Sequence, residues 1–327
     1  MLSCASTDLG GVHAVIVELS ASSGYVCART DRGTVRCSGS FLVDRREGPL
    51  STPIYPAPDA RAGVELLTGV TAIGTNPRFA CGVASGHPLC WGLLERGFNS
   101  VSAPAPTSVS QILNANVVVE SVVAVVGGAR DLVCVIGGDS QVTCSGGFTL
   151  PPAAVDVAAG AQVCAIIDDG ITPRRLMCTF GQAETVVAFS SPVVPESLDK
   201  SSAACAVATD HRVYCLDYRR GPTWQVVDGL DDVRKTASFC AIRSDGSVWC
   251  WGSNSAGQLG RGYVSQQTDV AAAPVVSLPN SAIDVVTGSG FACALTAKHE
   301  VWCWGSNEAH QLGVDGQESS VPILVLN

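Results

Sequence analysis

The sequence predicts an all-β protein folded as a single seven-bladed β-propeller. Three observations lead to this fold class: seven cysteine pairs recur at nearly constant spacing, an apolar strand precedes most pairs, and two C-terminal stretches repeat with few differences. A repeat at this period is typical of a propeller or a solenoid. The 327 residues are sufficient for seven units of about 45 residues in one domain.

The clearest repeat begins at Phe239 and again at Phe291. The first copy reads FCAIRSDGSVWCWGSNSAGQLG, and the second reads FACALTAKHEVWCWGSNEAHQLG. In the first copy, Asp245-Gly246 supplies the positive φ of a tight hairpin turn, and the β-branched and aromatic residues 248–251 predict the return strand. Cys240 and Cys250 would then lie opposite each other on one face, within reach of a disulfide. The tryptophans of the return strand share the other face, where they can pack on a neighbouring sheet.

Fourteen of the fifteen cysteines form pairs of this kind. The expected pairs are Cys27 with Cys37, Cys81 with Cys90, Cys134 with Cys144, Cys164 with Cys178, Cys205 with Cys215, Cys240 with Cys250, and Cys293 with Cys303. The second pair is one residue shorter than most, which suits a two-residue Ser85-Gly86 turn, and the fourth is longer, which predicts an extended hairpin tip over residues 168–175. We therefore expect one hairpin disulfide per blade, each stabilising by roughly 2–3 kcal/mol on the chain-entropy argument. The alternative is reduced cysteines that only pack.

The two long copies resemble the repeat of the regulator of chromosome condensation family, whose fold is a seven-bladed β-propeller. Residues 79–92 resemble it moderately, and the other units keep the cysteine frame, although Cys215-Leu216-Asp217 lacks the usual glycine. With these weak units the resemblance covers residues 13–327 and leaves residues 1–12 as an N-terminal tail. We expect a strand over residues 13–20 to pair with the last strand, residues 321–326, and close the ring. The resemblance implies the fold and no particular activity, because propellers host many functions.

The regular cysteine pairs indicate an oxidising compartment, which is extracellular, periplasmic or at the cell surface. No apolar run approaches the roughly 18 residues of a transmembrane helix, so no transmembrane segment is expected. Leu2-Ser3-Cys4 resembles the end of a bacterial lipoprotein box, although Met1 stands where the box has leucine. Cys4 is therefore a candidate lipid anchor, with a free thiol and an intermolecular disulfide as the alternatives.

The net charge and the absence of known catalytic and metal-binding motifs argue against several classes of function. The net charge is −9, and only three of the 20 basic residues are lysines, which disfavours binding to nucleic acid or to an anionic membrane. The sequence contains no nucleophile-elbow, zinc-protease, EF-hand or phosphate-loop motif. We therefore expect no catalytic residue, no metal and no cofactor, and we expect the protein not to be an enzyme.

Three histidines, His87, His211 and His299, stand six residues after the first cysteine of their units, where other units have glycine. We expect them to be turn residues with positive φ, because hairpin tips on separate blades are too far apart to share one metal. An acidic stretch with Asp228, Asp231 and Asp232 could hold Ca²⁺, but a solvated loop is the preferred interpretation. Trp224, with Tyr214 and Tyr218 nearby, is either an exposed contact residue or part of the core.

Three long segments, residues 42–69, 93–116 and 261–280, are expected to be loops, and loops on a rigid scaffold usually carry binding residues. We expect a secreted or surface-anchored module that binds another protein or surface macromolecule through them. The first alternative is an extracellular enzyme that acts on glycans in the central funnel. The second is guanine-nucleotide exchange on a small GTPase, as in the founding member of the family, which the acidic charge and the paired cysteines disfavour.

Overall fold

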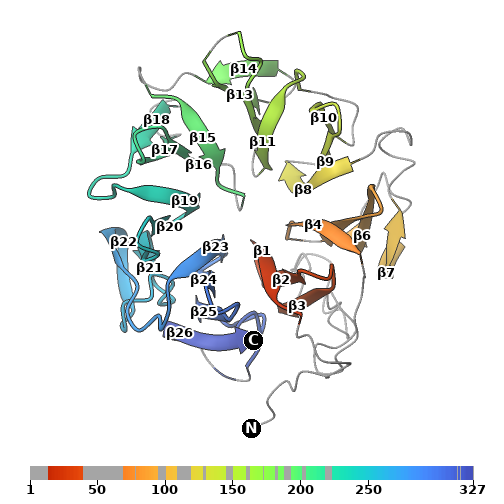
Figure 1. The fold of residues 1–327 in the computed structure, drawn as a ribbon. Coiled ribbons are helices and arrows are strands. Elements are labelled where there is room, and N and C mark those ends of the chain that lie inside the picture. Colours follow the sequence, from red (N-terminus) through yellow and green to blue (C-terminus); the bar gives the residue numbers. More distant parts are fainter. Residues whose placement is uncertain are drawn as a thin grey trace.

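The computed structural model describes residues 14–39, 69–77, 79–94, 101–108, 119–127, 130–144, 150–159, 163–171, 173–180, 183–187, 193–200, 204–217, 223–314, 316 and 318–326. Their strands form seven antiparallel sheets, which follow one another around a common centre in chain order (Figure 1). We call these sheets blades 1 to 7. The described residues give four strands to every blade except blades 1 and 3, which have three.

The strands run from the centre outward in each blade. Blades 1 to 3 contain β1 (Ile16–Ser22), β2 (Tyr25–Thr30) and β3 (Val35–Gly39); β4 (Val70–Thr75), β5 (Phe79–Ala84), β6 (His87–Leu94) and β7 (Val101–Ser108); and β8 (Val119–Gly127), β9 (Arg130–Gly137) and β10 (Val142–Cys144). Blades 4 and 5 contain β11 (Ala154–Ala159), β12 (Val163–Ile167), β13 (Arg175–Phe180) and β14 (Ala183–Val187); and β15 (Pro195–Leu198), β16 (Cys205–Ala208), β17 (Val213–Asp217) and β18 (Thr223–Val226). Blades 6 and 7 contain β19 (Val233–Ala237), β20 (Cys240–Arg243), β21 (Val248–Asn254) and β22 (Ser265–Pro274); and β23 (Ala282–Gly288), β24 (Phe291–Thr296), β25 (Val301–Gly305) and β26 (Ser319–Leu326).

A disulfide-linked hairpin forms the middle of every blade. In order from blade 1 to blade 7, the disulfides are Cys27–Cys37, Cys81–Cys90, Cys134–Cys144, Cys164–Cys178, Cys205–Cys215, Cys240–Cys250 and Cys293–Cys303. These are the seven pairs expected from the sequence, and the two Cα atoms of each pair are 4.0 or 4.1 Å apart.

The paired cysteines are direct partners in the strand register of all seven hairpins. They occupy the closely spaced, non-hydrogen-bonded sites of the antiparallel ladder, where side chains approach most closely. The cysteine spacing therefore sets the register of each hairpin.

The hairpin turns confirm two of the three histidine predictions. His211 and His299 have φ of 58° and 62°, in the region that the glycines occupy at the same position of other blades. His87 does not, because it is the first residue of β6 and pairs with Ala84. The reason is the shorter hairpin of blade 2, which turns at Ser85 instead, with φ of 52°.

The hydrophobic core consists of layers between adjacent blades. The disulfide of blade 6, Cys240–Cys250, lies in a buried cluster shared with blade 7. Trp249 and Trp251, on the other face of the same blade, pack against a cluster that includes Val207 of blade 5. This confirms the expectation that cysteines and tryptophans face opposite neighbours. Each blade thus covers both of its faces only within a ring.

Blade 7 meets blade 1 by side-chain packing. Ile16 and Leu19 of β1 share a buried cluster with Val286 and Leu312 of blade 7. The expected pairing of the first and last strands is wrong, because the register joins β1 to β2 and β26 to β25. The physical reason is their position: β1 is an inner strand and β26 is an outer strand, so their edges do not meet (Figure 1).

Two of the three predicted loops contain outer strands. β7 lies within residues 93–116 and β22 within residues 261–280. Proline is tolerated in outer strands because their far edge needs no ladder hydrogen bond, and β7 contains Pro104 and Pro106. Most of the segment 42–69, the tail 1–12 and Cys4 lie outside the described residues. In the described parts of the chain, no helix is long and apolar enough to cross a membrane.

Candidate functional site

The blade 6 loop between β21 and β22 folds around one buried asparagine. The Asn254 side chain accepts a hydrogen bond from the Leu259 N–H at 3.1 Å and donates one to the Tyr263 carbonyl at 2.9 Å. Both Asn254 and Leu259 are fully buried. One side-chain amide therefore bonds the backbone within the Gln-Leu-Gly segment, at Leu259, and after it, at Tyr263, and holds the loop in one conformation.

The blade 7 loop between β25 and β26 has the same arrangement around a buried asparagine, with one more hydrogen bond. Asn307 accepts from the Leu312 N–H at 2.9 Å and donates to the carbonyls of Val314 and Gly316 at 3.0 and 3.1 Å. The Gln311 Oε1 accepts from the Ala309 N–H at 2.8 Å and closes the intervening turn. The result is a loop in which two buried side-chain amides bond the backbone at four described residues.

These loops also connect neighbouring blades. The Trp304 indole of blade 7 donates to the Gln258 carbonyl of the blade 6 loop at 2.9 Å, and Trp304 is fully buried. Ser38 of blade 1 has the corresponding role one blade further on, because its hydroxyl donates to the His310 carbonyl at 3.3 Å. The loops of blades 6 and 7 are thus fixed at both ends, to their own blade and to the next.

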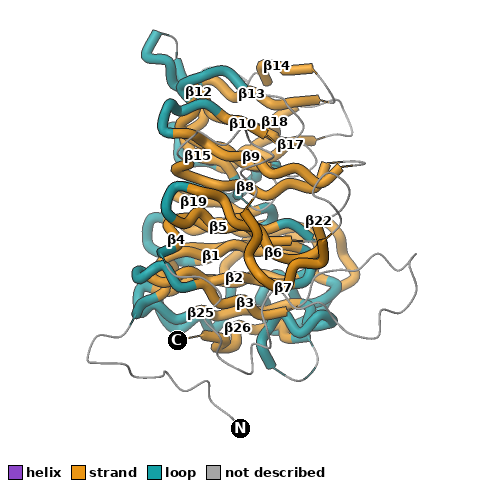
Figure 2. The backbone as a smooth tube through the Cα atoms, turned by 90° about the vertical axis from the view of Figure 1, so that its right-hand side faces the viewer, coloured by secondary structure: helices purple, strands orange, loops and turns teal. Residues whose placement is uncertain are grey.

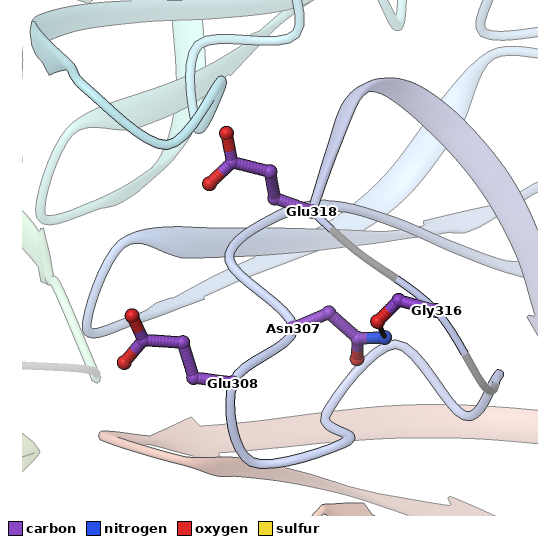
Figure 3. Close-up of a pocket in the computed structure, with 4 residues that line it drawn as sticks. All are labelled: Asn307, Glu308, Gly316 and Glu318. Carbon is purple, nitrogen blue, oxygen red and sulfur yellow. Dashed lines mark hydrogen bonds between the residues drawn. The ribbon is translucent and has the colours of Figure 1, made fainter.

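A pocket of about 310 Å³ lies against the blade 7 loop, lined by Asn307, Glu308, Gly316 and Glu318. Figure 3 shows the two glutamates projecting in the same direction from opposite sides of the loop, while the Asn307 amide turns away from them toward Gly316. Both glutamates are exposed, whereas Asn307 is buried. Neither carboxylate forms an ion pair with any residue that the structure describes.

The chemistry of this pocket is that of an anionic acceptor. Two ionised carboxylates accept hydrogen bonds and donate none, so they suit a guanidinium or an ammonium group. A metal site would need more ligands, and the described residues contain no group of three or more His, Cys, Asp or Glu placed to hold an ion. We therefore take the described residues of this loop, 306–314, 316 and 318, as the candidate site, with Glu308 and Glu318 as its recognition groups.

The other candidate residues from the sequence that the structure describes make structural contacts. Asp231 forms an ion pair with Arg243 at 2.5 Å, and Asp232 accepts a hydrogen bond from the Ser244 hydroxyl at 2.8 Å, so the acidic loop is a solvated turn. Trp224 is 4% exposed and belongs to the core between blades 4 and 5, which decides between its two interpretations. Tyr218 lies outside the described residues.

Three carboxylates on inner strands link adjacent blades. A β-bulge interrupts each inner strand at the same place, and the residue after it is Glu18 in β1, Asp156 in β11 and Asp284 in β23. Each accepts from a backbone N–H of the next blade, and each also pairs with a cationic side chain. The backbone donors are Ile73 at 3.5 Å, Leu198 at 2.8 Å and Leu19 at 3.3 Å, and the cations are Arg29, Lys200 and Lys235.

The last of these links joins blade 7 to blade 1 and so helps to close the ring. His299 adds a second link between the same blades, because its Nδ1–H donates to the Ile16 carbonyl at 2.8 Å. Burial raises the pKa of Glu18, although the nearby Arg29 guanidinium acts in the opposite direction. These inner-strand carboxylates are therefore occupied in holding blades together.

Sequence reasoning does not identify Glu308 or Glu318. A signal for the first exists in the repeat itself, because Glu308 stands where the first copy has Ser255. Asn254 and Asn307 are identical in the two copies, but identity alone does not reveal that their amides organise the loops. No pattern in the sequence indicates that Glu318 lies beside Glu308.

The ring of seven stapled blades defines this protein as a β-propeller, and solved structures share that fold. Human WBSCR16 is similar with a TM-score of 0.64 and 15% identity, over 88% of this chain and 89% of that chain. The CRINKLY WD40 ectodomain from the Arabidopsis thaliana receptor kinase ACR4 has a TM-score of 0.52 and 16% identity, over 95% and 99%. At this level of identity, both likenesses concern the fold alone.

The repeats make the assignment more specific. Two models of the regulator of chromosome condensation (RCC1) repeat match residues 245–295 and 282–311. Mouse Protein RCC2 is 35% identical over 115 residues, which are 34% of this chain and 20% of that protein, and rat Alsin is 36% identical over 77 residues, 24% and 5%. The chain is an RCC1-like β-propeller. The matched stretch spans a fifth or less of the length of these relatives.

Proposed function

We propose that this RCC1-like propeller is a secreted or cell-surface module, without catalytic activity, that binds a protein partner through the blade 7 loop. An arginine or lysine side chain of the partner is held between Glu308 and Glu318. The observation that carries the proposal is the pairing of two exposed carboxylates across a pocket whose loop is fixed by the buried Asn307 amide. A site that is ordered before binding loses less conformational entropy on association.

Exposed apolar residues of the blade 6 loop, which is bonded to the strand after Glu318, support a protein partner over a free small cation. Gly262 of the blade 6 loop donates its N–H to the Ser320 carbonyl at 2.9 Å, two residues after Glu318. Tyr263 and Val264 follow directly and are 54% and 50% exposed. An anionic pocket on one loop, with an exposed aromatic and an aliphatic residue on the loop bonded to the following strand, fits a peptide segment that carries both a basic and an apolar residue.

The charge and the disulfides support the remaining parts of the proposal. A net charge of −9 favours encounter with a basic surface at moderate ionic strength. Seven disulfides suit an oxidising compartment, from which the secreted or surface location is inferred. A glycan-cleaving enzyme would need free carboxylates toward the centre of the ring, whereas Glu18, Asp156 and Asp284 are engaged between blades.

The proposal is tested by titrating the ¹⁵N-labelled oxidised protein with N-acetyl-arginine amide. N-acetyl-citrulline amide, which has nearly the same shape without the charge, serves as the control ligand. We expect amide shifts in residues 306–318 with arginine only, at a Kd of about 1 mM, which corresponds to about 4 kcal/mol. Glu308→Gln and Glu318→Gln should each weaken these shifts, while Glu196→Gln, which removes an exposed carboxylate of β15, should not. Equal shifts with citrulline, or unchanged binding in both pocket variants, would refute the proposal.

A further inference from the structure

The blade 4 hairpin is longer than those of the other blades. Its cysteines, Cys164 and Cys178, are 14 residues apart, against 9 or 10 elsewhere, and the extra residues form the tip between β12 and β13. In Figure 2 this tip is the loop at the upper left, which stands clear of the neighbouring turns. It lies on the opposite face of the ring from the Glu308 pocket. It joins the second and third strands of its blade whereas the pocket loop joins the third and fourth, and successive loops of an antiparallel sheet alternate between its two ends.

Two ion pairs brace the tip. The Arg174 Nε and the Asp168 Oδ2 are 2.7 Å apart, and the Arg175 Nη1 and the Asp169 Oδ2 are 2.6 Å apart. The other carboxylate oxygen of Asp169 accepts the Ile171 N–H at 3.0 Å. The base of the tip is anchored as well, since the Asp168 N–H donates to the Ala153 carbonyl at 2.9 Å. The two acids and two arginines balance in charge and hold the backbone around Ile171.

Ile171 is presented to solvent at the end of this braced hairpin. Its side chain is 88% exposed, whereas the next most exposed large apolar side chain among the described residues, Tyr263, is 54% exposed. Other hairpin tips carry polar residues, such as Asp31-Arg32 in blade 1 and Lys298-His299 in blade 7. A single exposed aliphatic residue is ordinary on a protein surface. Here, however, the residue stands at the tip of an extended hairpin whose two arms are joined by two ion pairs.

We propose that the blade 4 tip is a second docking site, separate from the pocket, that inserts Ile171 into an apolar pocket on a folded protein partner. Burying this side chain would remove its apolar surface from water, which favours the complex. The neighbouring charges are already paired, so their burial at the rim of the contact leaves no lone ion. A lipid surface is a poorer occupant, because one aliphatic side chain gives marginal anchoring and the −9 net charge repels anionic headgroups.

Photo-crosslinking of the full oxidised protein tests this site. Benzoylphenylalanine replaces Ile171 in one sample and Asp245, at the tip of the blade 6 hairpin, in the control sample. Each is irradiated with the concentrated secreted proteins of the producing organism, the adduct is identified by mass spectrometry, and that partner is purified and titrated by calorimetry. We expect an adduct from position 171 only, and a Kd at least about tenfold weaker for Ile171→Asp. The double variant with Asp168→Ala and Asp169→Ala, which keeps Ile171 but removes the brace, should weaken binding to a smaller extent.

Several results would overturn the inference. They are the absence of an adduct specific to position 171, a purified partner that binds Ile171→Asp as tightly as the parent, and an adduct consisting of a second copy of this chain. Ile171-dependent binding to vesicles of 70% phosphatidylcholine and 30% phosphatidylglycerol would assign the tip to a lipid surface instead. The Ile171 variants leave Glu308 and Glu318 unchanged, so this proposal and the arginine-binding proposal can fail separately.

Discussion

Replacing Asn307 by alanine should release the loop that carries the candidate site. The substitution removes three hydrogen bonds, to Leu312, Val314 and Gly316. A typical bond contributes about 0.5–1.5 kcal/mol, and a buried donor without a partner costs about 1–3 kcal/mol. The Leu312 N–H would become such a donor, because this residue is fully buried. We therefore expect the free energy of unfolding of this loop to fall by about 2–4 kcal/mol.

Native-state hydrogen exchange measures this change at the Leu312 amide, whose protection should fall by roughly 30- to 1,000-fold. The same variant should lose arginine binding, because Glu308 and Glu318 are no longer held across the pocket. Asn254→Ala is the matched control: it removes two bonds of the same kind in the blade 6 loop, to Leu259 and Tyr263. It should expose the Leu259 amide to exchange and leave arginine binding largely intact.

Two results would refute this reasoning. One is unchanged protection of the Leu312 amide in Asn307→Ala, which would mean that the side-chain amide does not hold the loop. The other is equal arginine binding by the two asparagine variants, which would mean that the pocket does not depend on that amide.

Three further predictions concern the ring. Asp284→Ala leaves the Leu19 N–H and Lys235 without their shared partner, so the free energy of unfolding in urea should fall by about 2–4 kcal/mol. A loss under about 0.5 kcal/mol would contradict a stabilising role for the Asp284 contact between blades 7 and 1. Burial raises the pKa of Glu18 above its ordinary value of 4.5, so the contribution of this residue to stability is full below that pH and is lost as the pH rises through the raised value. The parent should therefore lose stability relative to Glu18→Gln as the pH rises above 4.5, and a parallel pair of curves would contradict burial as the cause. The Cys205–Cys215 disulfide should be reduced first by a limiting amount of phosphine, because Cys215 alone among the fourteen paired cysteines is not buried. Differential alkylation measures the order of reduction, and labelling of another pair first would contradict this prediction.

The cysteine spacing makes the hairpins predictable because a cross-strand disulfide requires arms of matched length on both sides of the turn. The same reasoning accommodates the shorter turn at Ser85 and the longer tip around Ile171. Outer strands are less predictable, since β22 has one solvent-facing edge and reads SQQTDVAAAP, without an alternating apolar pattern. Ring closure by packing between an inner strand and a distant blade leaves no local signal at all.

Sequence patterns do not predict the candidate site either, because the contacts that shape it are made with backbone groups. Glu308 and Glu318 are ten residues apart and line one pocket, and between them the Asn307 amide bonds the carbonyls of Val314 and Gly316. Those contacts are made with carbonyl groups, which every residue carries. The repeat shows that the asparagine recurs, but its hydrogen-bond partners are evident only in the folded structure.

Peptide mapping under non-reducing conditions tests most directly whether each of the seven blades contains its own hairpin disulfide. After digestion and mass spectrometry, fourteen cysteines should appear as seven linked peptides, each joining the two strands of one hairpin. A peptide that links cysteines from two different hairpins, or the recovery of these cysteines as free thiols from the natively secreted protein, would contradict it.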